Sequence, residues 1–218
     1  MIQWDEMEER KKAENSVVIS GYGGQGALFA GVLLAECLMR MKKFVTWLPS
    51  YGAQMRGGVA NCTVVISEDE ISSPVQKNPD YLIALNSQSI EHFENDVIKD
   101  GLIFVNSPDK EFVKKREDVG YFVVPANFLA KKIGEIKCAN LVMLGAFLQV
   151  FKPAAIKCLI RVIDTSKASV KGASVKFIRI NRRAIALGAS FANKMLKKNG
   201  EFKNFPDIAQ AGLALQHK

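Results

Sequence analysis

The chain has 218 residues, of which 48% are hydrophobic, and a formal net charge of +8. This length and apolar fraction suit one α/β domain with a sizeable core. No apolar stretch approaches the roughly 20 residues of a membrane span, and residues 1–15 lack the apolar block of a secretory signal, so we expect a cytoplasmic protein.

The chain begins with a charged arm, residues 1–15, which we expect to lie outside the core. Residues 16–20 form a short apolar run that ends in glycines, which is typical of a buried parallel strand. A helix is expected next, over residues 24–41. The segments 44–48 and 59–67 are then predicted as strands, joined by a loop that is rich in turn residues.

Strands alternate with helices through the rest of the chain. We predict strands at residues 81–85, 101–105 and 121–125, and helices at residues 87–97, 127–134, 140–151, 153–163 and 181–198. This alternation predicts a three-layer α/β/α sandwich with a mostly parallel sheet, Rossmann-like in its first βαβ unit. We assign residues 16–199 to a single domain and residues 200–218 to a C-terminal tail. Inside the last helix, Gly188 indicates close packing against another backbone.

The four cysteines do not form a metal-binding pattern. They stand at Cys37, Cys62, Cys138 and Cys158, with no Cys-x-x-Cys and with neither His92 nor His217 nearby. Zinc and iron–sulfur sites need three or four closely grouped ligands. We therefore predict no metal site in this chain and expect the cysteines to be reduced thiols in the core.

Positive charge is concentrated in the second half of the chain. Residues 1–100 carry 9 Lys and Arg against 14 Asp and Glu, whereas residues 101–218 carry 21 against 8. A basic half can indicate nucleic-acid binding, but these cations are scattered and are not interleaved with aromatic side chains. We expect a solvated surface or a face for an acidic partner subunit, and no nucleic-acid partner.

A glycine turn follows the first predicted strand. Gly21-x-Gly23-x-x-Gly26 between a strand and a helix satisfies the dinucleotide-binding pattern, and free N–H groups at a helix start can face an anion. A Rossmann enzyme also needs an acid about 20 positions later to hold the ribose, and residues 45–50 contain none. A glycine turn can equally serve only to pack the helix closely on the sheet, so both interpretations stay open.

A second loop, residues 47–58, follows the second predicted strand. We therefore expect it at the same carboxyl edge of the sheet as the glycine turn, where ligands bind in open α/β sheets. It combines a rigid proline, a tyrosine, one arginine and paired glycines: Pro49, Tyr51, Arg56, Gly57 and Gly58. Arginine can hold a carboxylate or a phosphate through two parallel hydrogen bonds, and glycines permit close approach of another backbone. The alternative is that the arginine is a solvated loop cation.

These motifs resemble the gamma subunit of 2-oxoacid:ferredoxin oxidoreductases. The matching segments fall in order over about residues 15–195: 21–26, 47–52, 55–58 with 60–62, 73–74, 79–80 with 82–86, 105–107, 140–146, and 180–181 with 184–188. The second motif, residues 47–52 and 55–58 with 60–62, is more similar to the corresponding segment of 2-oxoglutarate and branched-chain members than to that of pyruvate members. Ala53-Gln54 departs from the Pro-Glu expected there.

The resemblance implies a subunit of a complex that oxidatively decarboxylates a 2-oxoacid, with 2-oxoglutarate expected, to an acyl-CoA. It implies that thiamine diphosphate with Mg and the iron–sulfur clusters belong to partner subunits, and that coenzyme A is a co-substrate of the complex. The implied partners are alpha and beta subunits, a ferredoxin-like delta subunit as a further candidate, and ferredoxin or a similar acceptor. The alternative function is a self-sufficient dinucleotide-binding oxidoreductase.

The residues that match the two motifs are expected to line an interface beside the active site of the complex, near the path of coenzyme A, and none is expected to be catalytic. They are Gly23, Gly24, Gln25 and Gly26 from the turn, and Ser50, Tyr51, Gly52, Arg56, Gly57 and Gly58 from the loop. A side chain at Gly24 is expected to collide with the start of the helix or with a partner. The charged arm and residues 165–176 receive no role.

Overall fold

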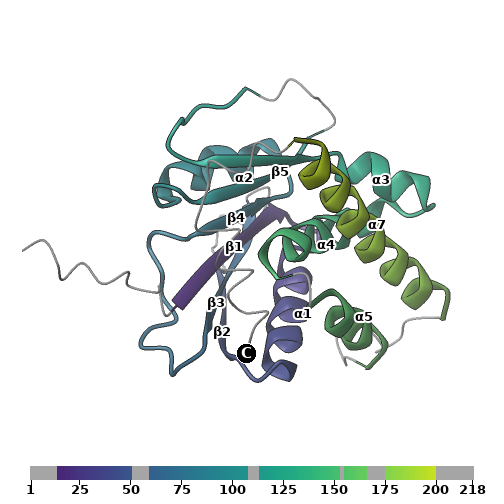
Figure 1. Cartoon of the computed structure of the whole chain (residues 1–218), viewed down its shortest axis with the longest axis horizontal. Helices are drawn as coiled ribbons and strands as arrows, with labels where there is room; N and C mark the ends of the chain where they lie inside the picture. Colours follow the sequence, from purple (N-terminus) through teal and green to yellow (C-terminus); the bar gives the residue numbers. More distant parts are fainter. Residues whose placement is uncertain (1–13, 51–58, 108–112, 153–154, 166–174, 200–218) are drawn as a thin grey trace, which may run out of the picture.

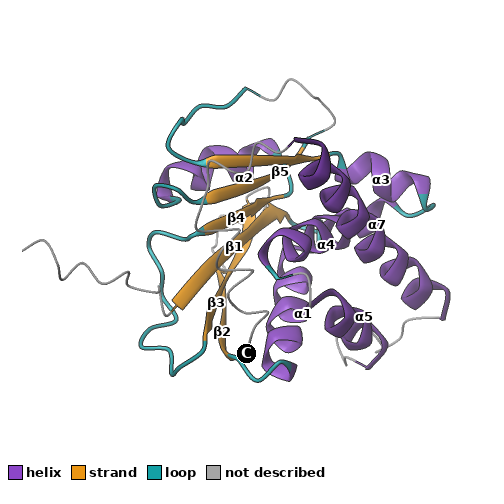
Figure 2. Cartoon of the chain, in the orientation of Figure 1, coloured by secondary structure: helices purple, strands orange, loops and turns teal. Residues whose placement is uncertain are grey.

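The structure is a computed structural model that describes residues 14–50, 59–107, 113–152, 155–165 and 175–199. Its strands are β1 (Glu14–Tyr22), β2 (Phe44–Ser50), β3 (Val59–Ser67), β4 (Tyr81–Ala84), β5 (Leu102–Asn106) and β6 (Gly120–Val124). Its helices are α1 (Ala27–Arg40), α2 (Ser87–Phe93), α3 (Ala126–Lys132), α4 (Ala139–Phe151), α5 (Ala155–Thr165) and α7 (Val175–Asn199), with short 3-10 helices η3 (Glu94–Asp96) and η4 (Ile136–Cys138). Figure 1 and Figure 2 show a sheet with helices on both faces, which confirms the predicted fold class.

The described strands form one six-stranded sheet in the order β2-β3-β1-β4-β5-β6. The pairs β1–β4, β4–β5 and β5–β6 are parallel, whereas β3 runs antiparallel to both of its neighbours. β1 and β2 therefore run in the same direction and form the expected βαβ unit with α1. The sequence did not predict that β3 lies between β1 and β2. In a dinucleotide-binding fold the second strand lies directly beside the first, whereas here β3 separates β2 from the strand that carries the glycine turn.

The predicted strands all lie within two residues of the observed bounds, but three helices differ more. α2 ends at Phe93 rather than at residue 97, because the 3-10 helix η3 follows it. α1 begins at Ala27 rather than at residue 24, because Gly24 and Gly26 have φ angles of +92° and +76°, which no right-handed helix contains. α7 begins at Val175 rather than at residue 181. Its first turns are rich in β-branched and aromatic residues of low helix propensity, and packing of Ile178 and Ile180 against the core outweighs that preference.

The two faces of the sheet are covered unequally (Figure 1). α1 and α4 pack on one face against residues such as Val17 and Ile19, while the short α2 covers Val18 and its neighbours on the other. α4 is buried along residues 140–148 because the sheet lies on one side of it and α7 on the other. None of the described helices is long and apolar enough to span a membrane.

The contact between α4 and α7 depends on two glycines. A Cβ atom built on Gly188 of α7 would lie 1.9 Å from the carbonyl oxygen of Val142, and one built on Gly145 of α4 would lie 2.2 Å from that of Ile185. Backbone atoms cannot move aside as the end of a long side chain can. The two helices therefore touch backbone to backbone, which confirms the close packing predicted at Gly188.

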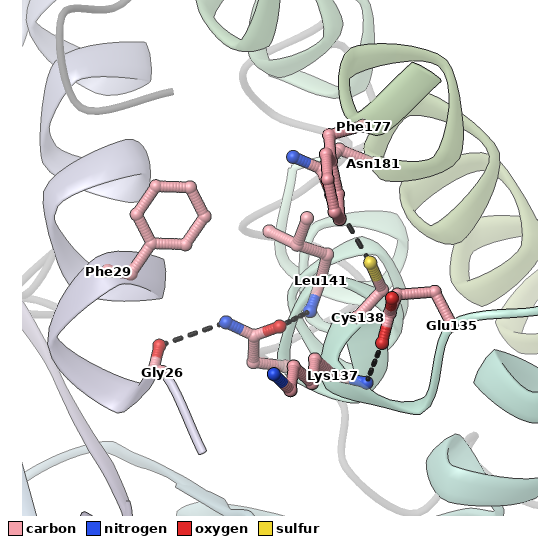
Figure 3. A pocket seen from close by; sticks show the side chains of 9 residues that line it. Gly26, Phe29, Glu135, Lys137, Cys138, Leu141, Phe177 and Asn181 are labelled. Atoms are coloured by element: carbon pink, nitrogen blue, oxygen red, sulfur yellow. Dashed lines mark hydrogen bonds between the residues drawn. The ribbon is translucent and has the colours of Figure 1, made fainter. Parts of the chain in front are cut away.

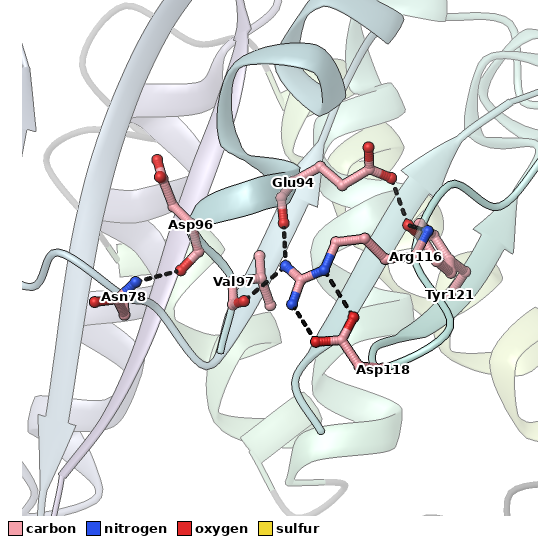
Figure 4. Close-up of polar contacts among 7 residues, drawn as sticks. All are labelled: Asn78, Glu94, Asp96, Val97, Arg116, Asp118 and Tyr121. Carbon is pink, nitrogen blue, oxygen red and sulfur yellow. Dashed lines mark hydrogen bonds and ion pairs between the residues drawn. The ribbon is translucent and has the colours of Figure 1, made fainter. Parts of the chain in front are cut away.

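The opposite, amino edge of the sheet carries a polar cluster around Arg116 (Figure 4). Its guanidinium donates to the carbonyl oxygens of Glu94 (2.6 Å) and Val97 (2.8 Å) and to both carboxylate oxygens of Asp118 (2.9 and 2.6 Å). The Tyr121 hydroxyl donates to the Glu94 carboxylate, and burial together with this bond raises the pKa of Tyr121 to about 12. This cluster holds the segments before β5 and β6 together, away from the edge with the glycine turn.

The glycine contact can be tested by replacing Gly188 with alanine. We expect Gly188→Ala to lower the free energy of unfolding by about 1–3 kcal/mol or more, because α4 and α7 must separate to admit the methyl group. Gly23→Ala is the matched control, because no described atom lies within 4 Å of a Cβ there and its φ is not positive. Urea unfolding of both variants measures the difference, and equal stability would contradict the proposed contact.

Candidate functional site

The carboxyl edge of the sheet brings the glycine turn close to the described residues that flank the second loop. Ser20 of β1 and Ser50 of β2 pair with the same residue, Asn61 of β3, and Ser20 also pairs with Ala84 at the end of β4. The glycine turn therefore begins at the edge where β2 ends and β3 begins, as predicted. Ser50 is exposed there. The other predicted residues of the second motif lie outside the described residues: Tyr51, Gly52, Arg56, Gly57 and Gly58.

The glycine turn is a tight turn that ends at the start of α1. The Gln25 amide donates to the carbonyl oxygen of Tyr22 at 3.0 Å, and Gly26 then caps the helix in a left-handed conformation. A Cβ on Gly26 would lie 2.4 Å from Nδ2 of Asn140, so this glycine is required by both space and φ. At Gly24 no described atom lies within 4 Å of a Cβ, so a methyl group would meet no crowding from the start of the helix, and the expected collision with a partner stays a prediction. Within the described chain, the positive φ of Gly24, rather than crowding, is what disfavours a side chain there.

Gln25, predicted to line a ligand or interface, uses its side chain to hold the turn. Its Oε1 accepts hydrogen bonds from the Tyr22 amide (2.7 Å) and from Nδ2 of Asn86 (2.8 Å). Its Nε2 donates to the carbonyl oxygen of Leu85 at 3.4 Å. These bonds tie the turn after β1 to the residues that follow β4. The structure therefore supports a positioning role for Gln25, with Gly23 and Gly24 as the exposed part of the turn.

Asparagine side chains continue this bonding along the edge. Asn86 caps α2 by accepting from the Ser89 amide at 2.8 Å. Asn106, at the end of β5, donates to the carbonyl oxygen of Leu85 and to Oδ1 of Asn127, both at 3.1 Å. We call Gln25, Asn86, Asn106 and Asn127 the amide row. Sequence reasoning assigned no role to its three asparagines, although an asparagine directly after two of the parallel strands was an available signal.

A hollow of about 230 Å³ lies beside Gly26 (Figure 3). Its walls come from the starts of α1, α4 and α7 together with η4: Gly26, Phe29, Glu135, Lys137, Cys138, Asn140, Leu141, Phe177 and Asn181. Asn140 joins two of these elements, because its Nδ2 donates to the carbonyl oxygen of Gly26 at 3.0 Å. The hollow therefore borders the same helix start as the glycine turn.

The cysteine in the wall of this hollow is a neutral thiol. Cys138 donates to Oδ1 of Asn181 at 3.2 Å, and burial, with Glu135 nearby, raises its pKa to about 11. All four cysteines are free, and three are buried as predicted, while Cys158 is only half-buried. Burial raises the pKa of Cys62 to about 12. In the part of the chain that the structure describes, no three His, Cys, Asp or Glu side chains form a group that could hold a metal ion.

The described residues at this edge offer amides, backbone N–H groups and a mostly apolar hollow whose wall includes Glu135 and Lys137. Amide side chains do not titrate, so they can bind and orient a partner but cannot act as general acids or bases. This arrangement suits a surface that positions a ligand or another protein chain.

Comparison with known proteins places the chain among oxidoreductase subunits. The family model for pyruvate ferredoxin/flavodoxin oxidoreductase matches residues 16–191. Ketoisovalerate oxidoreductase subunit VorA of Methanothermobacter marburgensis is 34% identical over 91% of this chain and 40% of that protein. 2-Oxoglutarate synthase subunit KorC of the same organism is 35% identical over 59% of this chain and 73% of that protein. The chain spans about two fifths of the length of the VorA relatives.

A solved structure extends the likeness to the fold. The gamma subunit of a keto/oxoacid ferredoxin oxidoreductase from Geobacter sulfurreducens is 27% identical, with a TM-score of 0.67 over 83% of this chain and 99% of that one. Almost the whole of that subunit is therefore matched by this chain.

The role of Gln25 can be tested with Gln25→Met, which keeps the length of the side chain and removes its polar atoms. We expect the free energy of unfolding to fall by about 1 kcal/mol or more, because the Tyr22 amide and Asn86 lose their acceptor. Hydrogen exchange at the Tyr22 amide should become faster. Gln88→Met, at an exposed position of α2, is the control and should change stability little. Identical exchange at Tyr22 in both variants would count against the positioning role.

Proposed function

The chain belongs to the pyruvate ferredoxin/flavodoxin oxidoreductase family, and we propose that it acts as the gamma subunit of a cytoplasmic complex that converts a 2-oxoacid to an acyl-CoA. The observation that carries this proposal is the match to nearly the whole length of a solved gamma subunit. The fold agrees with it, because Ser50 and Val59, which flank the second loop, lie at the same edge of the sheet as the glycine turn.

We propose a division of labour between this chain and its partners. The chain spans about two fifths of the VorA relatives, so further polypeptide must supply the rest of such an enzyme. Alpha and beta subunits, with a ferredoxin-like delta subunit as a further candidate, would carry thiamine diphosphate with Mg and the iron–sulfur clusters. Ferredoxin or a similar acceptor would receive the electrons. The chain by itself would then be inactive.

We propose that the carboxyl edge contributes a contact surface beside the active site of that complex. Gly23 and Gly24 are exposed and leave space for another backbone or a ligand to approach closely. The N-terminus of α1 favours a negatively charged group, such as a phosphate of coenzyme A or a partner carboxylate. Arg56, in the segment between Ser50 and Val59, would bind the same negative charge, since both flanking residues lie at this edge.

For the substrate we propose 2-oxoglutarate, with ketoisovalerate as its competitor. The similarity to KorC supports the first acid and the similarity to VorA supports the second. The matched relatives give no support to the alternative of a self-sufficient dinucleotide-binding oxidoreductase. The insertion of β3 also weakens it, because the end of β2, where a ribose-binding acid would stand, lies two strands from the glycine turn.

The proposed function can be tested by purifying the tagged chain from its native cell. We expect partner subunits to copurify and to oxidise 2-oxoglutarate in the presence of coenzyme A and a redox dye. Comparing 2-oxoglutarate with ketoisovalerate identifies the substrate. A chain that purifies alone, with oxoacid oxidation intact in cells that lack it, would contradict the proposal. Fluorescence titration with NADH and NADPH tests the dinucleotide alternative, which needs a saturable response.

The contact surface can be tested with Arg56→Ala in the same complex. Loss of a charge-assisted hydrogen bond typically removes about 1.5–3 kcal/mol, so we expect a roughly tenfold or larger drop in activity or assembly. Circular dichroism of the isolated subunit should stay unchanged. Lys77→Ala, which removes an exposed cation at the far edge of the sheet, should leave activity and assembly intact. Wild-type behaviour of Arg56→Ala would exclude it from the contact surface.

A further inference from the structure

α7 carries positive charge without any compensating acid of its own. Its 25 residues include seven Lys and Arg and no Asp or Glu. Exposed residues recur every three or four positions along it, so they lie on one face of the helix. On that face we define the basic stripe as Lys176, Arg179, Arg183, Lys194 and Lys197. Small residues, Ala186 and Ser190, occupy the middle of the same face.

The fold turns the basic stripe away from the core. The other face of α7 packs on α4, and Figure 1 shows α7 on the outside of the helical layer with α4 between it and the sheet. The start of α7 also borders the hollow beside Gly26, because Phe177 and Asn181 form part of its wall. The stripe therefore begins next to the candidate site and runs outward from it.

Within the chain, the positive charges of the stripe interact unfavourably with one another and with the helix dipole. Lys176 and Arg179 lie three residues apart, and Arg179 and Arg183 lie four apart, so like charges face each other along the helix. The first two also stand near the N-terminus of α7, the positive end of the helix dipole. Among the described cations of α7, only Arg182 forms an ion pair, and its partner is Asp164 of α5. Arg182 lies beside the stripe and is not part of it. The stripe residues have no ion-pair partner in the described part of the chain.

We propose that the basic stripe is a docking surface for an acidic face of a partner subunit. This inference rests on the proposed function, which supplies the partner. Its two groups of cations are separated by the eleven residue steps from Arg183 to Lys194, or about 16 Å of helix. The small residues between them allow another element to pack closely while carboxylates on either side meet the cations. Val175 and Phe177, 75% and 48% exposed, add apolar surface at one end.

A protein partner fits these residues better than a nucleic acid. A duplex backbone presents phosphates at short, regular intervals, whereas the middle of the stripe is neutral. The stripe also lacks the interleaved aromatic side chains on which single-stranded bases stack. The stripe has cations at both ends and small residues in its middle. A protein surface with carboxylates at both ends and a close-packing element between them would match this pattern.

Zero-length carbodiimide cross-linking of the purified complex tests the contact directly, because this reagent joins a lysine amine only to a carboxylate that touches it. We expect Lys176, Lys194 and Lys197 to link to Asp or Glu residues of one other subunit. Their acetylation should also slow by roughly fivefold or more between the isolated chain and the complex, as expected for amines that become buried and paired. Lys77 and Lys114, which are exposed on other parts of the chain, should show neither effect.

A pair of charge reversals separates the stripe from net charge. Arg179→Glu/Arg183→Glu and the control Lys77→Glu/Lys114→Glu change the net charge equally. We expect the first pair to weaken binding to subunits stripped from the purified complex by roughly tenfold or more, and the control to stay near wild type. Binding of the wild-type chain should weaken as salt rises, and that of the stripe variant should depend less on salt. Circular dichroism checks that both variants are folded.

Each outcome decides between the two hypotheses. The first outcome is that the wild-type complex assembles and is active, but the stripe lysines stay fully reactive and the stripe variant binds normally. That result overturns this inference and leaves the proposed function intact. A wild-type chain that assembles with no partner overturns the proposed function and this inference together. The third outcome is that the isolated chain binds a short DNA duplex in a salt-sensitive way, while the stripe variant assembles normally. That result would identify the stripe as a nucleic-acid-binding surface and would also overturn this inference.

Discussion

The backbone contact between α4 and α7 is the constraint on which the arrangement of this protein depends. Gly145 and Gly188 let the two helices touch, so α4 can be buried on all sides between the sheet and α7. A buried α4 places Asn140 against Gly26 and so fixes the start of α1. The same contact aims the charged face of α7 outward. One tight helix pair thus positions a polar turn on one side and a basic surface on the other.

The carboxyl edge shows how a binding surface can be stiff without ionic groups. Gln25 ties the glycine turn to the residues after β4, and Asn106 ties those residues to the start of α3. Gln25, Asn86 and Asn106 each both donate and accept, so bonds pass from one strand end to the next. The exposed glycines therefore rest on a fixed base. The ionic cluster of Arg116 with its acids lies at the opposite end of the sheet.

Much of this architecture could be predicted from local patterns, and the rest depends on distant partners. Apolar runs placed the six strands, and Gly188 indicated a close helix contact before its partner helix was known. The direction of β3 could not be predicted, because an apolar strand pattern is the same in either direction. The role of Gln25 depends on residues some sixty positions away, and the early start of α7 depends on the packing of Ile178 and Ile180. The open space around Gly24 likewise became visible only in three dimensions.

The neutral chemistry of the amide row has a consequence for the assembled enzyme. No member of the row gains or loses a proton over the physiological range, so the shape of the turn stays constant as acidity changes. The Cys138 thiol nearby, with its pKa raised to about 11, also stays neutral over that range. The row would therefore hold the glycine turn in the same position at every physiological pH. Any bell-shaped dependence of the reaction on acidity would then report groups outside the row.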